Sequence, residues 1–154
     1  MNRKVSATDY AYDAAPALGD TIEVAHGVHW LRMPLPFKLD HINLWLLEDN
    51  DEDGDGWTIV DTGINLDEVR DTWNGILATR ISSLKPLKRV VVTHFHPDHF
   101  GLAGWLTKNS GAPLWMPREE WAQARILSLE TNANSRDVFS RFYHHLESSN
   151  LFEL

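Results

Sequence analysis

A run of β-branched residues that leads into three histidines and a carboxylate constrains this chain more than any other feature. Residues 90–92 are valines, which suit a buried strand, and Pro97 and Gly101 stop that strand before an apolar helical pattern begins at Leu102. The polar residues in between are therefore predicted on a loop at the carboxyl end of a strand, where α/β proteins commonly keep their functional groups. They are His94, His96, Asp98 and His99.

The spacing of these four residues is typical of a metal site. His94 and His96 are two apart, so in extended backbone their side chains point to the same side. Pro97 then turns the chain, so that Asp98 and His99 approach from another direction. One short loop can thus present four ligands to two adjacent metal positions. The alternative, a loop of surface histidines, does not explain why they follow a buried strand.

Composition narrows both the metal ligands and the partners. The chain has no cysteine, so a metal must be held by imidazole and carboxylate. A formal charge of -8 disfavours nucleic acid, whose binding depends on lysine and arginine. No stretch approaches the roughly 20 apolar residues of a membrane span, and the polar start has no apolar segment of a signal peptide behind it. We therefore expect a cytoplasmic protein with neither a nucleic-acid nor a membrane partner.

Alternating and helical patterns predict an α/β domain with antiparallel hairpins at its front. Residues 1–20 lack periodicity and are expected to form a flexible arm, which leaves residues 21–154 for the domain. Besides the valine strand, we expect strands at residues 21–24, 28–33, 41–47, 57–61 and 112–116.

Helical patterns lie between and after these strands. Asn65 is a plausible N-cap with Glu68 three residues on, and an apolar stripe follows it. A two-turn helix should end at Gly111, and Pro117 should open another. The stripes are Leu66, Val69, Trp73, Ile76 and Leu77; Trp121, Ala124 and Leu127; and Val138, Phe139, Phe142 and Leu146.

The acidic segment at residues 48–56 resembles a calcium loop only in part. Asp49, Asp51, Asp53 and Gly54 match the first loop positions, but the twelfth position, which needs a bidentate glutamate, is Val60. The Asp-Gly pairs favour a solvated hairpin turn instead.

Two motifs, in the right order, carry a family resemblance. Residues 93–101, Thr-His-Phe-His-Pro-Asp-His-Phe-Gly, resemble the His-x-His-x-Asp-His signature of the metallo-β-lactamase fold superfamily. Residues 59–63, Ile-Val-Asp-Thr-Gly, resemble the strand end that precedes it, and residues 35–45 are similar to members of the glyoxalase II and lactonase type. The resemblance covers about residues 21 to 130 and implies an αββα sandwich of two similar halves, of which this chain matches the N-terminal half.

The resemblance also implies roles for single residues. His94 and His96 would bind one zinc ion, and Asp98 and His99 a second, with iron or manganese as alternative metals. Asp61 would orient the ligand loop by hydrogen bonding; its alternative role is a strand-end carboxylate that caps a turn. The implied activity is hydrolysis of an ester, thioester or lactone, a small-molecule substrate, by metal-activated water whose proton Asp98 would steer.

Part of the family's ligand set has no counterpart in this sequence. The family has a third histidine, a bridging aspartate and a final histidine on later strands. After His99 the histidines are His144 and His145, which are neighbours on a predicted helix and point about 100° apart, so we expect them on its surface. The alternative function is a catalytically incompetent half-domain that serves as a metal-binding or assembly module. An oxygen-using iron enzyme is a third possibility.

A truncated sandwich would leave an apolar sheet face open, so we expect self-association or pairing with a missing C-terminal half. His41 begins a strand behind a proline-rich loop and is a candidate for substrate contact; the alternative is a hydrogen-bonded structural histidine. Five tryptophans within predicted elements are expected in the core: Trp30, Trp45, Trp73, Trp105 and Trp115.

Overall fold

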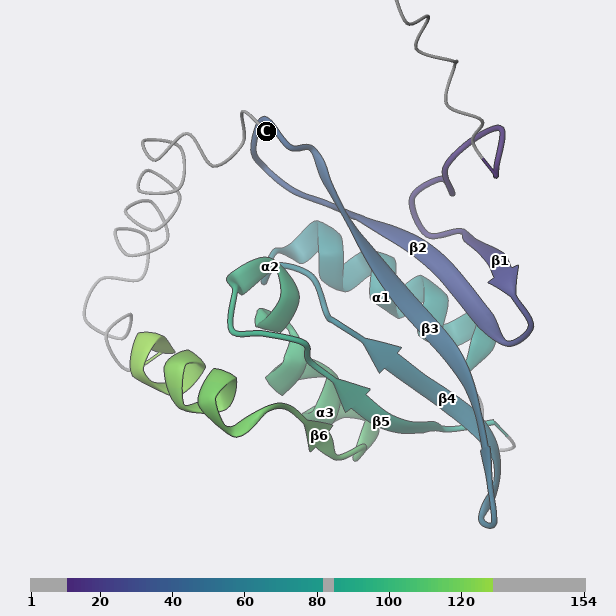
Figure 1. Ribbon diagram of the computed structural model, residues 1–154. Coiled ribbons are helices and arrows are strands. Elements are labelled where there is room, and N and C mark those ends of the chain that lie inside the picture. Colours follow the sequence, from purple (N-terminus) through teal and green to yellow (C-terminus); the bar gives the residue numbers. More distant parts are fainter. Residues whose placement is uncertain (1–10, 82–84, 129–154) are drawn as a thin grey trace, which may run out of the picture.

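Six strands form one mixed sheet in which each strand pairs with its neighbours in the sequence (Figure 1). The computed structural model describes residues 11–81 and 85–128. The first four strands pair antiparallel, and the last three pair parallel. This arrangement confirms the predicted α/β class with hairpins at its front. The strands are β1 (Thr21–Ala25), β2 (Val28–Pro34), β3 (His41–Asp51), β4 (Gly54–Val60), β5 (Leu87–Val91) and β6 (Leu114–Trp115).

Both hairpins lie where the sequence predicts, but β3 and β4 run farther into the acidic segment than expected, to Asp51 and from Gly54. β2 stops at Pro34, because proline cannot donate to a further ladder bond. β3 and β4 close with Asp51 opposite Gly54, so the acidic segment is a hairpin turn and the calcium-loop alternative is wrong. Arg89 pairs with Asp49 there, with 2.8 Å between Nε and Oδ2.

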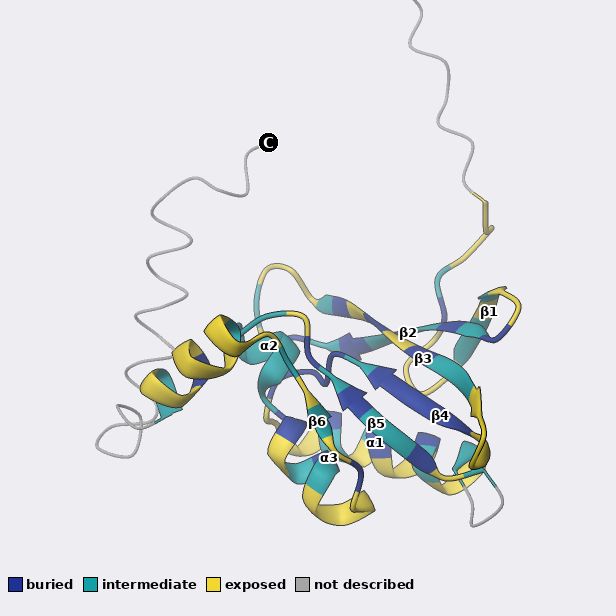
Figure 2. Cartoon of the chain, turned by 60° about the horizontal axis from the view of Figure 1, so that its bottom comes forward, coloured by how far each residue is buried: buried dark blue, intermediate teal, exposed yellow. Residues whose placement is uncertain are grey.

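Two helices cover one face of the sheet. α1 (Asp67–Arg80) and α3 (Ala103–Ser110) lie on the same side in both Figure 1 and Figure 2. The side chains that they bury alternate along the strands, as a period of two requires. The fully buried ones include Leu31, Met33, Leu44, Leu46, Ile59, Val69, Trp73, Val90, Val92, Leu102 and Leu106.

The start of α1 differs from the prediction. The N-cap is Leu66, and no side chain caps the helix. Asn65 instead accepts a hydrogen bond from Arg70 through its Oδ1. The predicted stripe is otherwise confirmed for Val69, Trp73 and Ile76, which are buried.

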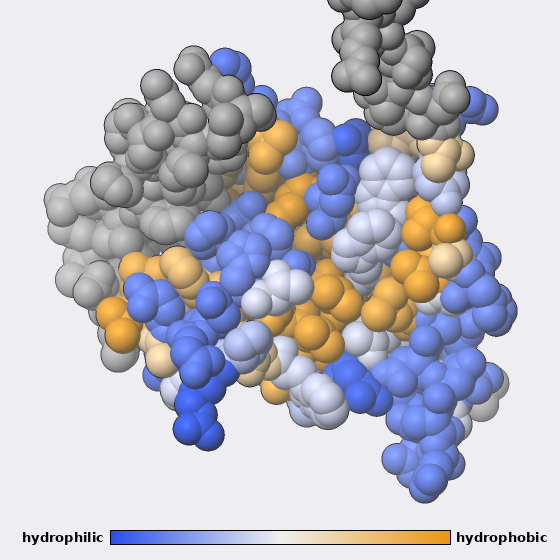
Figure 3. Space-filling view, in the orientation of Figure 1, coloured by the Kyte–Doolittle hydropathy of each residue, from blue (hydrophilic) through white to orange (hydrophobic). Residues whose placement is uncertain are grey.

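The opposite face of the sheet, here called the open face, carries Trp30, Arg32, Asn43 and Trp45. Among residues 11–81 and 85–128, no helix or strand packs over it, and apolar side chains are visible across it in Figure 3. Trp45 is 36% exposed and Trp115 is 55% exposed, so the core prediction is wrong for both, whereas Trp73 is fully buried. What covers the open face stays a prediction.

Residues 118–128 form a helix that starts directly after Pro117, as predicted. Ala124 is buried in it, but Trp121 is exposed. The predicted stripe at residues 138–146, with His144 and His145, lies outside the described residues. No helix in the described part of the chain combines the length and the apolar character that crossing a membrane requires.

Candidate metal centre

The four predicted ligands follow β5, which lies between β4 and β6 and runs parallel to both strands. β5 runs beside β4 and β6, and Val92 N donates to Trp115 O at 2.9 Å just beyond the end of β5. Because β4 and β5 are parallel, Asp61 after β4 and Thr93 after β5 emerge at the same edge. Asp61 N donates to Val91 O at 2.8 Å, which fixes the two strand ends together.

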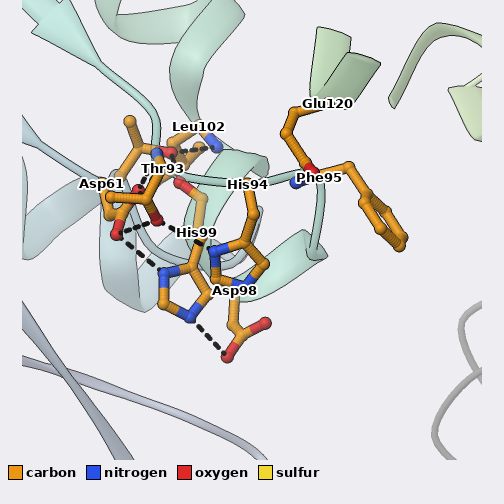
Figure 4. A network of polar contacts seen from close by, with 9 residues as sticks. Asp61, Thr93, His94, Phe95, Asp98, His99, Leu102 and Glu120 are labelled. Carbon is orange, nitrogen blue, oxygen red and sulfur yellow. Dashed lines mark hydrogen bonds and ion pairs between the residues drawn. The ribbon is translucent and has the colours of Figure 1, made fainter. Parts of the chain in front are cut away.

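Asp61 holds both ends of the ligand loop. Its carboxylate accepts from Thr93 N at 2.8 Å and from Thr93 Oγ1 at 2.8 and 3.0 Å, and its Oδ2 lies 2.8 Å from His99 Nδ1 (Figure 4). The residue is only 5% exposed and has a φ of 63°, a conformation that aspartate tolerates better than most residues. Burial alone would raise the pKa of Asp61, but the hydrogen bonds from His99 and Thr93 outweigh it, so the pKa is lowered. Asp61 is therefore an ionised anchor of the loop.

Thr62 also holds the ligand loop by hydrogen bonds. Its backbone N and its Oγ1 both donate to His99 O at 2.8 Å, and Oγ1 accepts from Leu102 N at 3.1 Å. Trp73 Nε1 in turn donates to Thr62 O at 2.7 Å. The segment after β4 is thus tied to α1 on one side and to the ligand loop on the other.

The second half of the motif is helical, whereas the sequence predicts a loop. Pro97–Phe100 form the short helix α2, which carries Asp98 and His99. Gly101 ends it where the backbone is crowded: a Cβ there would lie 2.4 Å from Pro97 O and 2.8 Å from Asn65 N. No side chain fits between these backbone atoms, so a glycine is required for this close approach.

The three imidazoles lie against one another. Ring centroids are 3.9 Å apart for His94 and His99, and 4.5 Å apart for His94 and His96. Asp98 Oδ2 lies 3.7 Å from His99 Nε2, so the carboxylate and this nitrogen face the same space (Figure 4). His94 Nδ1 lies 2.9 Å from Thr93 Oγ1. The structure therefore brings all four predicted ligands together.

The protonation state of the cluster suits metal binding. Burial lowers the pKa of His94 and of His96, and for His94 the neighbouring histidines lower it further. Neutral imidazoles keep the lone pair that a metal needs. Since Nδ1 of His94 and of His99 each face a hydrogen-bond partner, Nε2 of each is left for a metal.

The donor set fits zinc in chemistry, since zinc accepts imidazole and carboxylate ligands. Within residues 11–81 and 85–128, however, no group of three or more such side chains is arranged to hold one ion. The assignment of two ligands to each of two metal positions stays a prediction.

Glu120 and His41 make further side-chain hydrogen bonds. Glu120 Oε2 accepts from Phe95 N at 2.9 Å, a contact that sequence reasoning missed because nothing in the pattern links two residues 25 apart. His41 Nδ1 lies 2.5 Å from Asp40 Oδ1, and its Nε2 accepts from Arg32. His41 is thus hydrogen-bonded on the open face, and its contact with substrate stays a prediction.

Comparisons with known proteins agree with this geometry. Residues 38–145 match the family model of the metallo-beta-lactamase superfamily. A beta-lactamase domain protein from Burkholderia ambifaria shares 49% sequence identity and has a TM-score of 0.71, over 78% of this chain and 36% of that one. A metallo-beta-lactamase family protein from Thermus thermophilus shares 28% identity with a TM-score of 0.58, over 79% of this chain and 38% of that one.

A curated relative, a probable metallo-hydrolase of Bacillus subtilis, is 33% identical over 72 residues, which make up 47% of this chain and 21% of the relative. The chain thus spans little more than a third of the two similar structures and about a fifth of the curated relative.

Proposed function

Because the chain belongs to the metallo-β-lactamase superfamily, we propose that it is a metal-dependent hydrolase of a small-molecule ester, thioester or lactone. His94, His96, Asp98 and His99 would hold zinc, one ion or two. A bound zinc ion supplies Lewis acidity and lowers the pKa of a coordinated water to about 7.

The observation that carries this proposal is that the Asp61 carboxylate is hydrogen-bonded to both Thr93 and His99. A surface loop of histidines has no need of a buried carboxylate that fixes a ring nitrogen at 2.8 Å. Such a contact sets the tautomer, so that Nδ1 keeps the proton and Nε2 presents its lone pair. Asp98, whose Oδ2 faces the same space, would accept the proton of an attacking water.

Metal content and hydrolysis measured together test the proposal. The purified chain should hold near-stoichiometric zinc by elemental analysis and should cleave a chromogenic thioester or lactone. His96→Ala should lose both properties, whereas His26→Ala, at the fully exposed β1–β2 turn, should keep both. A chain without zinc would contradict the proposal for this species.

The second candidate is an assembly module that binds metal weakly or not at all. The exposed tryptophans near and on the open face favour it, since exposed apolar patches commonly mark interfaces. Stable self-association without hydrolysis would support this candidate over the enzyme.

A further inference from the structure

Arg32 on β2 is held by neutral partners. Its Nε donates to Asn43 Oδ1 at 3.3 Å, and its Nη2 donates to His41 Nε2. Trp30 Nε1 donates to the same Asn43 oxygen at 2.9 Å, and the Trp30 ring lies 5.8 Å from the guanidinium carbon. In the part of the chain that the structure describes, no carboxylate lies within ion-pair distance of Arg32. The guanidinium is therefore oriented without a direct ion pair, and the nearby charge of Asp40 reaches it only across the His41 ring.

His41 acts as the acceptor because Asp40 holds its other nitrogen. An N–H of Arg32 points to Nε2, so the proton of the ring lies on Nδ1 and is donated to Asp40 Oδ1 at 2.5 Å. The hydrogen bonds to Asn43 and His41 use two of the five N–H groups of Arg32. The remaining N–H groups keep the fork that matches a carboxylate.

Cations at the other end of the sheet form ion pairs with carboxylates. Lys85 pairs with Glu48 at 3.0 Å, Lys88 pairs with Asp51, and Arg89 pairs with Asp49 at 2.8 Å. The chain has a formal charge of -8, so carboxylates are plentiful. Arg32 differs from these three cations because it forms no ion pair with a carboxylate among the described residues. The position of Arg32 relative to the candidate metal centre indicates a function for its charge.

Arg32 lies at the end of the sheet that carries the candidate metal centre. The last pair between β3 and β4 is Trp45 with Val60, so Asn43 and His41 extend past the end of β4, by about 7 and 13 Å at the usual rise. About 10 Å, two strand spacings, separates β3 from β5. Figures 1 and 2 agree that the β2–β3 loop and α2 lie at this same end.

We propose that Arg32 binds a carboxylate of the substrate, whose carbonyl reacts at the metal centre at the same end of the sheet. This inference rests on the proposed hydrolase function and narrows its substrate class to esters, thioesters or lactones that carry a distal carboxylate. Asp40, 86% exposed beside His41, would repel a dianionic phosphate more than a carboxylate.

Two esters of matched length test the proposal. Mono-p-nitrophenyl suberate carries a carboxylate where p-nitrophenyl octanoate carries a methyl group. In the zinc-loaded chain, Arg32→Gln should lower the ratio of kcat/KM for suberate over octanoate about tenfold, mainly through KM, and Arg32→Lys should restore part of it. Arg89→Gln, a change of a paired cation farther along the open face, should leave the ratio as it is. An unchanged ratio in Arg32→Gln would overturn the inference.

A binding measurement separates this inference from the proposed function. Sodium suberate should shift the side-chain N–H resonances of Arg32 Nε and Trp30 Nε1, which are near the site, and Arg32→Gln should abolish the Trp30 shift. If neither ester is cleaved but these shifts occur, the hydrolase proposal fails and the carboxylate site stands. No shift with suberate, or an equal or larger shift with inorganic phosphate, would contradict the carboxylate site.

Discussion

Asp61 Oδ2 lies 2.8 Å from His99 Nδ1, although the two residues are 38 positions apart. The contact joins the end of β4 to α2, and the same carboxylate accepts both the N–H and the hydroxyl of Thr93. One buried side chain thus orients two parts of the ligand loop.

Asp61→Asn should weaken zinc binding about 10- to 100-fold. Asparagine also tolerates the φ of 63° at this position, so the backbone is preserved. Its amide NH₂, however, would donate to His99 Nδ1, which moves the ring proton to Nε2 and removes the lone pair available to a metal. Titration against a chelator of known affinity measures the loss.

The control for this change is Asn65→Asp, an exposed Asp/Asn exchange four residues on. It should leave zinc affinity within about twofold. Equal affinity in Asp61→Asn and in the unchanged protein would contradict the orienting role of Asp61.

Gly101→Ala should both destabilise the fold and weaken metal binding. The added Cβ meets the backbone atoms Pro97 O and Asn65 N, which cannot move without opening the contact between α2 and the segment after β4. Gly104→Ala is the matched control, since nothing lies within 4 Å of its Cβ, and it should stabilise α3 by about 0.5–1 kcal/mol. Urea unfolding measures the change in the free energy of unfolding for each variant. A Gly101→Ala protein as stable as the original would contradict the crowding at residue 101.

Stability should fall in acid partly because of His29. This residue is buried on the covered face against Trp57, with 5.3 Å between ring centroids, and its Nε2 has no hydrogen-bond partner among the described residues. Burial, and then the charge of Arg80, lowers the pKa of His29 below its ordinary 6.5. Protonation therefore favours the unfolded chain, and the free energy of unfolding should decrease as the pH drops below 6.5.

His29→Phe should make this decrease smaller, because phenylalanine does not titrate. His26→Phe, at a fully exposed position, serves as the control for the loss of one histidine. Melting midpoints between pH 8 and pH 5 provide the measurement. The same pH dependence in His29→Phe and in the original chain would show that His29 does not contribute.

The chain should self-associate through its open face. Trp45 on this face is 36% exposed, and large exposed aromatic side chains often anchor interfaces. Trp45→Ser should raise the dissociation constant about tenfold in sedimentation experiments. Trp121→Ser, which removes an exposed tryptophan from residues 118–128, should have a smaller effect. A strictly monomeric chain at high concentration would refute the prediction.

The strands and the ligand motif could be predicted because their signals are local. Ile42, Leu44 and Leu46 alternate with exposed residues, and the period of two places them on one buried face. The histidines follow the valine run at residues 90–92, of which Val90 and Val92 are fully buried. Both features need only a few neighbouring residues to be recognised.

Other features depend on contacts between distant segments. Alternation shows that Trp45 opposes Leu44 and Leu46, but not which face of the sheet a helix covers. The cap expected at Asn65 fails because Arg70, one turn into α1, occupies its Oδ1. The contact of Glu120 with Phe95 arises only when β6 is paired beside β5.

The strand order, in which every strand pairs with its sequence neighbours, has a consequence for how this chain acquires its site during synthesis. Each pairing closes only a short or medium loop, so little chain entropy opposes any one step, and the sheet can grow strand by strand from the amino end. Asp61 and Thr62 precede the histidines in the chain and directly follow the β3–β4 hairpin, so the residues that hold the ligand loop are synthesised before it. The ligand loop therefore needs only the parallel pairing of β5 with β4, a step across a medium-length connection, to reach the residues that hold it.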